Sequence, residues 1–166
     1  MELISPNFQG ILLSEANRGD LLVSIKTKES CIYLQVGTPE ESYILALSDT
    51  FTTWPTKSIQ AVPYLKLMAK WRFRLKPEFP KEKANNPVGV PLGYLSISEA
   101  GWFITSKTND SYGLGDEILI DVCSFSLTER SAETLKPCLY TGWVIEYRSN
   151  DDEPWSTLFD PGLQQT

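Results

Sequence analysis

Four cations alternate with hydrophobic residues in the segment 69–77, which reads AKWRFRLKP. Successive side chains of a β-strand point to opposite faces, so this alternation puts Trp71, Phe73 and Leu75 on one face and the cations on the other. Cations spaced about 6 to 7 Å apart along a strand face can contact phosphates or carboxylates. We call this set the basic strip, and it consists of Lys70, Arg72, Arg74 and Lys76.

The basic strip has three interpretations. Acids of a neighbouring strand, such as Glu117, Asp121 or Glu146, can neutralise it, and this is the favoured one because cross-strand ion pairs are ordinary. Docking of another protein is the second. Nucleic acid comes third, because the net charge of −6 repels a polyanion and because the aromatic residues of the strand point away from its cations.

Catalytic motifs are absent from the sequence. The chain contains no histidine, which excludes Ser-His-Asp and Cys-His nucleophiles and imidazole-ligated metals. The segment 108–121, TNDSYGLGDEILID, gathers acids around two glycines, but its spacing departs from that of a calcium loop. We therefore expect no metal, no cofactor and no enzyme. A carboxylate-based hydrolase remains the last alternative, because two acids on a β scaffold can cleave glycosidic bonds.

Charge is unevenly distributed along the chain. Residues 57–83 hold eight Lys and Arg against two Glu, a local charge of +6, whereas residues 1–56 sum to −4 and residues 84–166 to −8. A fold that keeps residues 57–83 together is therefore bipolar, with one basic side.

Short alternating runs bounded by Gly, Pro, Asn and Asp recur through the chain and predict β-strands joined by turns. The segments 98–101 and 27–30 are expected to be hairpin turns. Ten strands in 166 residues predict an all-β single domain, a curved β-sandwich or partly closed antiparallel β-barrel with at most one or two short helical turns. The strands are predicted at residues 10–14, 21–27, 31–36, 43–48, 59–62, 66–76, 92–98, 102–106, 117–126 and 139–148.

Two segments have helical features and one reads as a long loop. Thr128 can cap one or two helical turns that end before Pro137. Helix is also an alternative for residues 64–70, although strand is favoured there. Four prolines and two adjacent asparagines predict a loop over residues 76–93, either functional or a simple connection.

The last residues differ from the rest. Three acids at 151–153 lead into Trp155, Leu158 and Phe159. We therefore divide the chain into an all-β domain, residues 1–150, and an acidic, aromatic tail, residues 151–166. The tail is expected to fold back as a cover for the core, and a recognition segment for another protein is the alternative.

The compartment is expected to be the cytoplasm. The first segment lacks the early cations and the apolar stretch of a secretory signal, and no apolar run approaches the ~18 residues that span a bilayer. The three cysteines are an odd number without CxxC spacing, and each lies in an apolar context that suits a core thiol.

Elimination leaves a non-catalytic protein-binding or assembly module that uses the basic strip and the Pro-rich loop. The expected partner is another protein, with nucleic acid and membrane not expected and a homodimer through strand edges left open. A ligand-binding β domain, for carbohydrate or single-stranded nucleic acid, is the alternative, with Trp54 and Trp155 as candidates for stacking on a sugar. The candidate partner-binding residues are Lys70, Arg72, Arg74, Lys76, Trp155 and Phe159.

Overall fold

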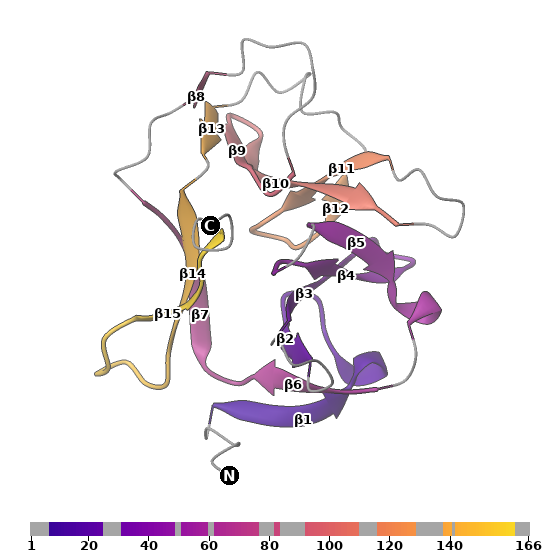
Figure 1. Ribbon diagram of the computed structural model, residues 1–166, viewed down its shortest axis with the longest axis vertical. Helices are drawn as coiled ribbons and strands as arrows, with labels where there is room; N and C mark the ends of the chain where they lie inside the picture. Colours follow the sequence, from indigo (N-terminus) through magenta and orange to yellow (C-terminus); the bar gives the residue numbers. More distant parts are fainter. Residues whose placement is uncertain are drawn as a thin grey trace.

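The protein is all-β, as predicted. The computed structural model describes residues 7–24, 31–48, 51–59, 62–76, 82–83, 92–109, 116–128, 138–140 and 142–161. These residues form a twelve-stranded sheet and a three-stranded sheet, with helical structure limited to two 3-10 turns, η1 (Leu13–Glu15) and η2 (Thr56–Ser58). The sheets face one another without closing into a barrel (Figure 1), which confirms the curved sandwich or partly closed barrel.

The larger sheet curls around the molecule in the order β1-β6-β2-β3-β4-β5-β10-β9-β13-β8, and β11 joins it between β10 and β12. Among the described strand pairs, β5 and β10 run parallel and the others are antiparallel. The strands of the larger sheet are β1 (Phe8–Leu12), β2 (Leu21–Ser24), β3 (Ile32–Gly37), β4 (Ser42–Ala46), β5 (Thr52–Pro55), β6 (Pro63–Leu67), β8 (Glu82–Lys83), β9 (Leu95–Ser98), β10 (Gly101–Thr108), β11 (Glu117–Asp121), β12 (Leu127–Thr128) and β13 (Cys138–Tyr140).

The smaller sheet forms the opposite wall, on the left of Figure 1. It contains β7 (Lys70–Leu75), β14 (Trp143–Arg148) and β15 (Ser156–Phe159) in the order β15-β14-β7. β14 is therefore the central strand, and it pairs antiparallel with both neighbours.

The space between the two sheets is the hydrophobic core. Trp143 is fully buried there, and its indole N–H donates to the Gly93 carbonyl at 2.9 Å, so the polar atom of the ring is satisfied. The rings of Phe51, Phe73 and Phe159 pack around it with centroids 5.6 to 6.1 Å away. These contacts join residues far apart in the sequence.

The two predicted hairpins have the expected strand pairing. β9 and β10 are antiparallel with Ser98 opposite Gly101, whose φ of 136° is accessible to glycine. β2 and β3 also pair antiparallel, although the turn at residues 27–30 lies outside the described residues.

The prediction for residues 59–76 was partly wrong. Neither Ile59 nor Val62 lies in a strand, and the rest of the expected strand at 59–62 lies outside the described residues. The expected strand at 66–76 is two strands in different sheets, β6 and β7. Pro63 begins β6, a position that tolerates its missing N–H. The Met68 N–H donates to the Asn7 carbonyl at 2.7 Å where the chain leaves the larger sheet. The helix alternative for 64–70 was also wrong.

Other boundaries differ because tertiary contacts define them. β5 and β15 were not predicted as strands. The predicted strand 117–126 ends at Asp121, where a turn follows with the Phe125 N–H donating to the Asp121 carbonyl at 2.8 Å. Thr128 belongs to β12. The rest of its proposed helix, residues 129–137, lies outside the described residues, as does most of the predicted loop 76–93. Within that loop the prediction was wrong at Glu82 and Lys83, which form β8 and pair with β13.

Candidate functional site

Glu146 of β14 lies between two arginines of the basic strip. It accepts hydrogen bonds from Arg72 Nη2 at 3.0 Å and from Arg74 Nε at 2.6 Å. The Glu146 side chain is 8% exposed, whereas those of Arg72 and Arg74 are 46% and 42% exposed. Burial alone would raise the pKa of Glu146, but the hydrogen bonds and charges of Arg74 and Arg72 outweigh it and hold that pKa below its ordinary value of 4.5.

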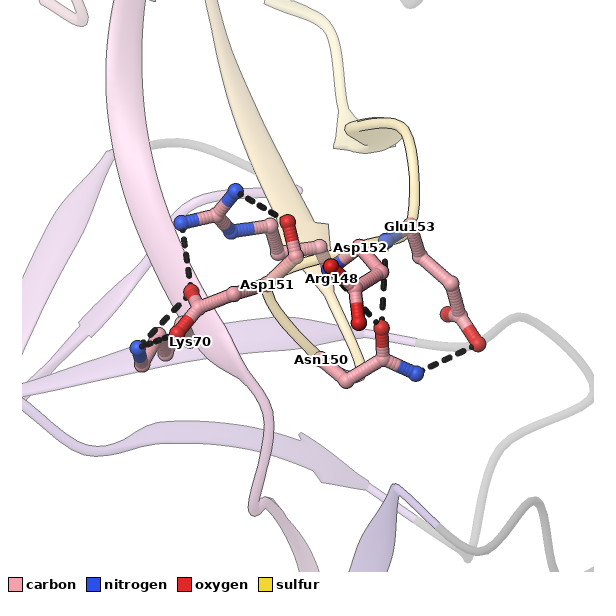
Figure 2. Close-up of polar contacts among 6 residues, drawn as sticks. All are labelled: Lys70, Arg148, Asn150, Asp151, Asp152 and Glu153. Carbon is pink, nitrogen blue, oxygen red and sulfur yellow. Dashed lines mark hydrogen bonds and ion pairs between the residues drawn. The ribbon is translucent and has the colours of Figure 1, made fainter.

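The turn between β14 and β15 supplies an acid at one end of the strip (Figure 2). Asp151 Oδ1 lies 2.9 Å from Lys70 Nζ and 2.7 Å from Arg148 Nη2. The hydrogen bond and charge of Lys70, followed by the charge of Arg148, lower the pKa of Asp151. At the other end, Lys76 pairs with Asp160. Every cation of the basic strip therefore has a carboxylate partner in the same chain.

These ion pairs support the neutralisation interpretation of the basic strip. Glu146 is one of the acids proposed for that role. Glu117 and Asp121 were also proposed, but wrongly, because β11 lies in the larger sheet and pairs with β10 and β12. With Arg148 included, five cations share three carboxylates. Docking of an acidic partner on this face stays a prediction.

The two aromatic residues proposed for partner binding have different environments. Trp155 is half-buried, with Arg72 Cζ 4.0 Å and Arg148 Cζ 4.6 Å from its ring centroid, so it stacks on two cations. Phe159 is 3% exposed and its ring contacts Trp143. Partner binding through Trp155 stays a prediction, whereas Phe159 reaches a partner only if β15 separates from β14.

β7 is an edge strand whose second edge has no strand beside it among the described residues. The Lys76 N–H donates to the Gly142 carbonyl at 2.9 Å, and the register continues with Arg74 opposite Val144. Hydrogen-bonded and non-bonded pairs alternate in an antiparallel ladder, so the even-numbered residues of β7 bond to β14. The backbone N–H and C=O groups of Trp71 and Phe73 therefore point to the unpaired edge.

A groove of about 400 Å³ lies beside this edge. It is bounded by β7, by the turn that precedes β2 and by the turn between β11 and β12. Aromatic carbon forms much of its surface, since the Trp71 ring lies 5.4 Å from the Phe73 ring and 5.5 Å from the Phe125 ring, centroid to centroid. The lining residues are Arg18, Gly19, Asp20, Trp71, Arg72, Phe73, Val122 and Phe125.

Two charged side chains of the groove have different partners. Asp20 Oδ2 lies 2.8 Å from Lys66 Nζ, and neither side chain is more than 22% exposed. Arg18 is exposed and donates to the Thr38 carbonyl at 2.7 Å. No carboxylate of the described residues pairs with Arg18. Arg18 is therefore a cation available to a bound group.

Most of the residues that line the groove were not predicted from the sequence to form a site. Trp71 and Phe73 were predicted on the apolar face of their strand, and both pack against the core, but the alternation does not show that this face also borders a groove. Arg18, Gly19 and Phe125 were not singled out at all. The run NRGD at 17–20 has the composition of a turn, but nothing local shows that Phe125 packs on it.

A second pocket, of about 570 Å³, opens near the ends of β4, β5, β10 and β11. Tyr43 lines it and donates to Glu41 Oε2 at 2.6 Å. That hydrogen bond, with burial, raises the pKa of Tyr43 to about 12, so the phenol does not act as a base near neutral pH. Asp116 and Glu117 in the same lining are both exposed. This pocket is therefore a weaker candidate for a functional site than the groove beside β7.

Comparisons with known proteins identify no relative: no family model, curated protein or solved structure gives a significant match. In the part of the chain that the structure describes, no three His, Cys, Asp or Glu side chains gather to hold a metal ion. No helix there has the length and apolar character needed to cross a membrane. The groove beside β7 is therefore the main indication of function.

Proposed function

We propose that this chain is a non-catalytic protein-binding module that accepts an extended segment of a partner along the unpaired edge of β7. The observation that carries the proposal is the alternation of hydrogen bonding in β7, which leaves the backbone groups of Trp71 and Phe73 pointing toward an aromatic groove. Such an edge binds an extended peptide through main-chain hydrogen bonds, and an adjacent pocket selects its side chains.

The groove suits binding better than hydrolysis. Asp20 is the single carboxylate among the described lining residues, and it is paired with Lys66. Glycosidic hydrolysis needs two carboxylates at about 5 to 9 Å. The second candidate is a planar ligand, such as a base or a sugar, because Trp71 and Phe125 line the same groove as Arg18.

We also propose a cytoplasmic location. Cys31 and Cys123 are both thiols in the structure, and Cys123 is exposed. An oxidising compartment favours disulfides, whereas glutathione and thioredoxin keep cytosolic thiols reduced. Imaging of the tagged protein in its native cell tests this proposal, and a secreted product carrying an intermolecular disulfide at Cys123 contradicts it.

The binding proposal is tested with a pair of variants at one position. Peptides that bind the wild-type chain are selected from a random display library. Phe73→Pro removes an N–H that points away from β14, whereas Phe73→Leu removes the same ring and keeps that N–H. We expect the peptides to lose binding to Phe73→Pro and to retain most binding to Phe73→Leu, with both variants folded by circular dichroism.

Hydrogen exchange provides the second measurement. Bound peptides should protect the amides of Trp71 and Phe73 from exchange. Selected peptides that leave both amides unprotected, or a library that yields no peptide at this edge, would overturn the proposed function.

A further inference from the structure

We infer that the partner segment is a β-strand of alternating acidic and apolar residues, with the acids over the basic strip and the apolar residues in the groove. This inference rests on the proposed function and adds the chemistry of the partner. A strand added to the edge of β7 continues both faces of the sheet. The outer face and the inner face of β7 therefore each select side chains of the partner.

The outer face of β7 favours acids on the added strand. Arg72 and Arg74 share one carboxylate, that of Glu146, and more than two-fifths of each arginine side chain remains exposed. Lys70 shares Asp151 with Arg148 and its side chain is 65% exposed. Side chains directly opposite in a sheet have Cβ atoms about 4.5 to 5.5 Å apart, so acids opposite these cations complete their pairing.

The inner face favours apolar side chains. Residues of the added strand opposite Trp71 and Phe73 point into the groove, toward Phe125 and Val122. Trp71, Phe73 and Phe125 are all half-buried, so part of each ring is left for a partner to cover. At the groove rim, Arg18 offers a further contact for an acid at the end of the partner strand.

A second copy of the chain fits this edge poorly. If two β7 strands paired antiparallel with their faces matched, the cations of one basic strip would lie opposite those of the other. Like charges directly opposite one another destabilise a sheet, and cations on an edge strand are a common defence against self-pairing. The basic strip therefore discriminates between a second copy and an acidic partner.

Three labelled peptides test the inference by fluorescence anisotropy: alternating Glu/Val, alternating Gln/Val and alternating Lys/Val, all of equal length. Because the Glu/Val peptide can form two or more cross-strand ion pairs, it should bind about tenfold more tightly than the Gln/Val peptide. The Lys/Val peptide should not bind. The advantage of Glu/Val should shrink at ~1 M salt, where charges are screened within about 3 Å.

Arg18→Glu should weaken binding of the Glu/Val peptide about threefold to tenfold, because it places a carboxylate at the groove rim. Lys107→Glu is the matched control, since Lys107 is an exposed cation on β10 in the larger sheet, and it should leave binding unchanged. Both side chains are exposed, so both variants should fold. Equal losses in the two variants would show a general charge effect and overturn the inference.

The outcomes separate the inference from the proposed function. If the Gln/Val peptide binds as tightly as the Glu/Val peptide, or if none of the three peptides binds, the inference fails. The proposed function is still tested independently by the peptides selected from the library. Protection of the Trp71 and Phe73 amides by an oligothymidylate strand instead would assign the groove to nucleic acid. Protection that appears with rising concentration of the chain alone would assign it to a second copy.

Discussion

The ring of Phe125 lies against Gly19, so close that a Cβ on residue 19 would sit 2.8 Å from two carbons of the ring. Both residues have a positive φ, 56° for Phe125 and 90° for Gly19. β3 holds both backbones, because the Gly19 N–H donates to the Gln35 carbonyl at 2.8 Å and the Gly37 N–H donates to the Phe125 carbonyl at 3.1 Å. A non-glycine residue at positive φ stores strain that its surroundings must offset, and such residues cluster at functional sites.

Gly19→Ala should therefore destabilise the fold. The new methyl group would clash with the Phe125 ring, and the positive φ of residue 19 disfavours any L-residue. We therefore expect the free energy of unfolding, measured by urea denaturation, to fall by about 2 to 3 kcal/mol. Gly10→Ala is the control. A Cβ at residue 10 has no neighbouring atom within 4 Å, and the change should stay within ~0.5 kcal/mol. Equal stabilities of the two variants would contradict the close packing of Phe125.

Amide hydrogen exchange should alternate along β7. Arg72 and Arg74 donate to β14, so their amides should be protected, whereas the amides of Trp71 and Phe73 point to the unpaired edge and should exchange at least about tenfold faster. Two-dimensional NMR of the free chain in deuterated buffer measures this pattern. Uniform protection across β7 would show that another segment covers the edge, and would remove the basis for strand addition.

The stabilising effect of Glu146 should depend on pH. Its pKa is lower in the folded state than in the unfolded state, so its ion pairs stabilise the fold above about pH 4.5 and are lost as the pH falls through the folded-state pKa. Glu146→Gln should reduce the free energy of unfolding by about 1 to 2 kcal/mol at neutral pH. The difference from wild type should shrink as the pH falls through the lowered pKa of Glu146.

Glu99→Gln controls for the loss of one acid, because Glu99 is exposed in the turn between β9 and β10. The Glu99→Gln variant should leave the free energy of unfolding nearly unchanged at neutral pH and at acidic pH. If Glu146→Gln kept its full effect at low pH, the stabilisation would come from the shape of the side chain rather than from its charge.

The all-β class and the two faces of β7 followed from the sequence because both depend on local properties, the alternation of side chains and the composition of turns. The groove did not, because it depends on a contact between residues 19 and 125. The same arrangement occurs with Phe51, whose φ is 50° and whose ring lies against Gly93. In each pair a phenylalanine at positive φ packs on a glycine at positive φ, and no local pattern connects the two.

The break between β6 and β7 shows the same limit. Three consecutive apolar residues, Leu67, Met68 and Ala69, interrupt the alternation, but the strict alternation that follows them favours one long strand over residues 66–76. The structure divides it because β6 bonds to β1 and β2 whereas β7 bonds to β14. Partner strands decide where a strand ends, and those partners lie far away in the chain.

Within the C-terminal segment, Phe159 should contribute more to the stability of the fold than Trp155. Phe159 is buried against Trp143, so Phe159→Ala should reduce the free energy of unfolding by about 3 to 5 kcal/mol. Trp155 is half-buried over two guanidinium groups, and Trp155→Ala should lose only about 1 kcal/mol. Thermal and urea denaturation measure both. A larger loss for Trp155→Ala than for Phe159→Ala, or a melting temperature unchanged by removal of residues 151–166, would contradict this stabilising role and favour a recognition segment.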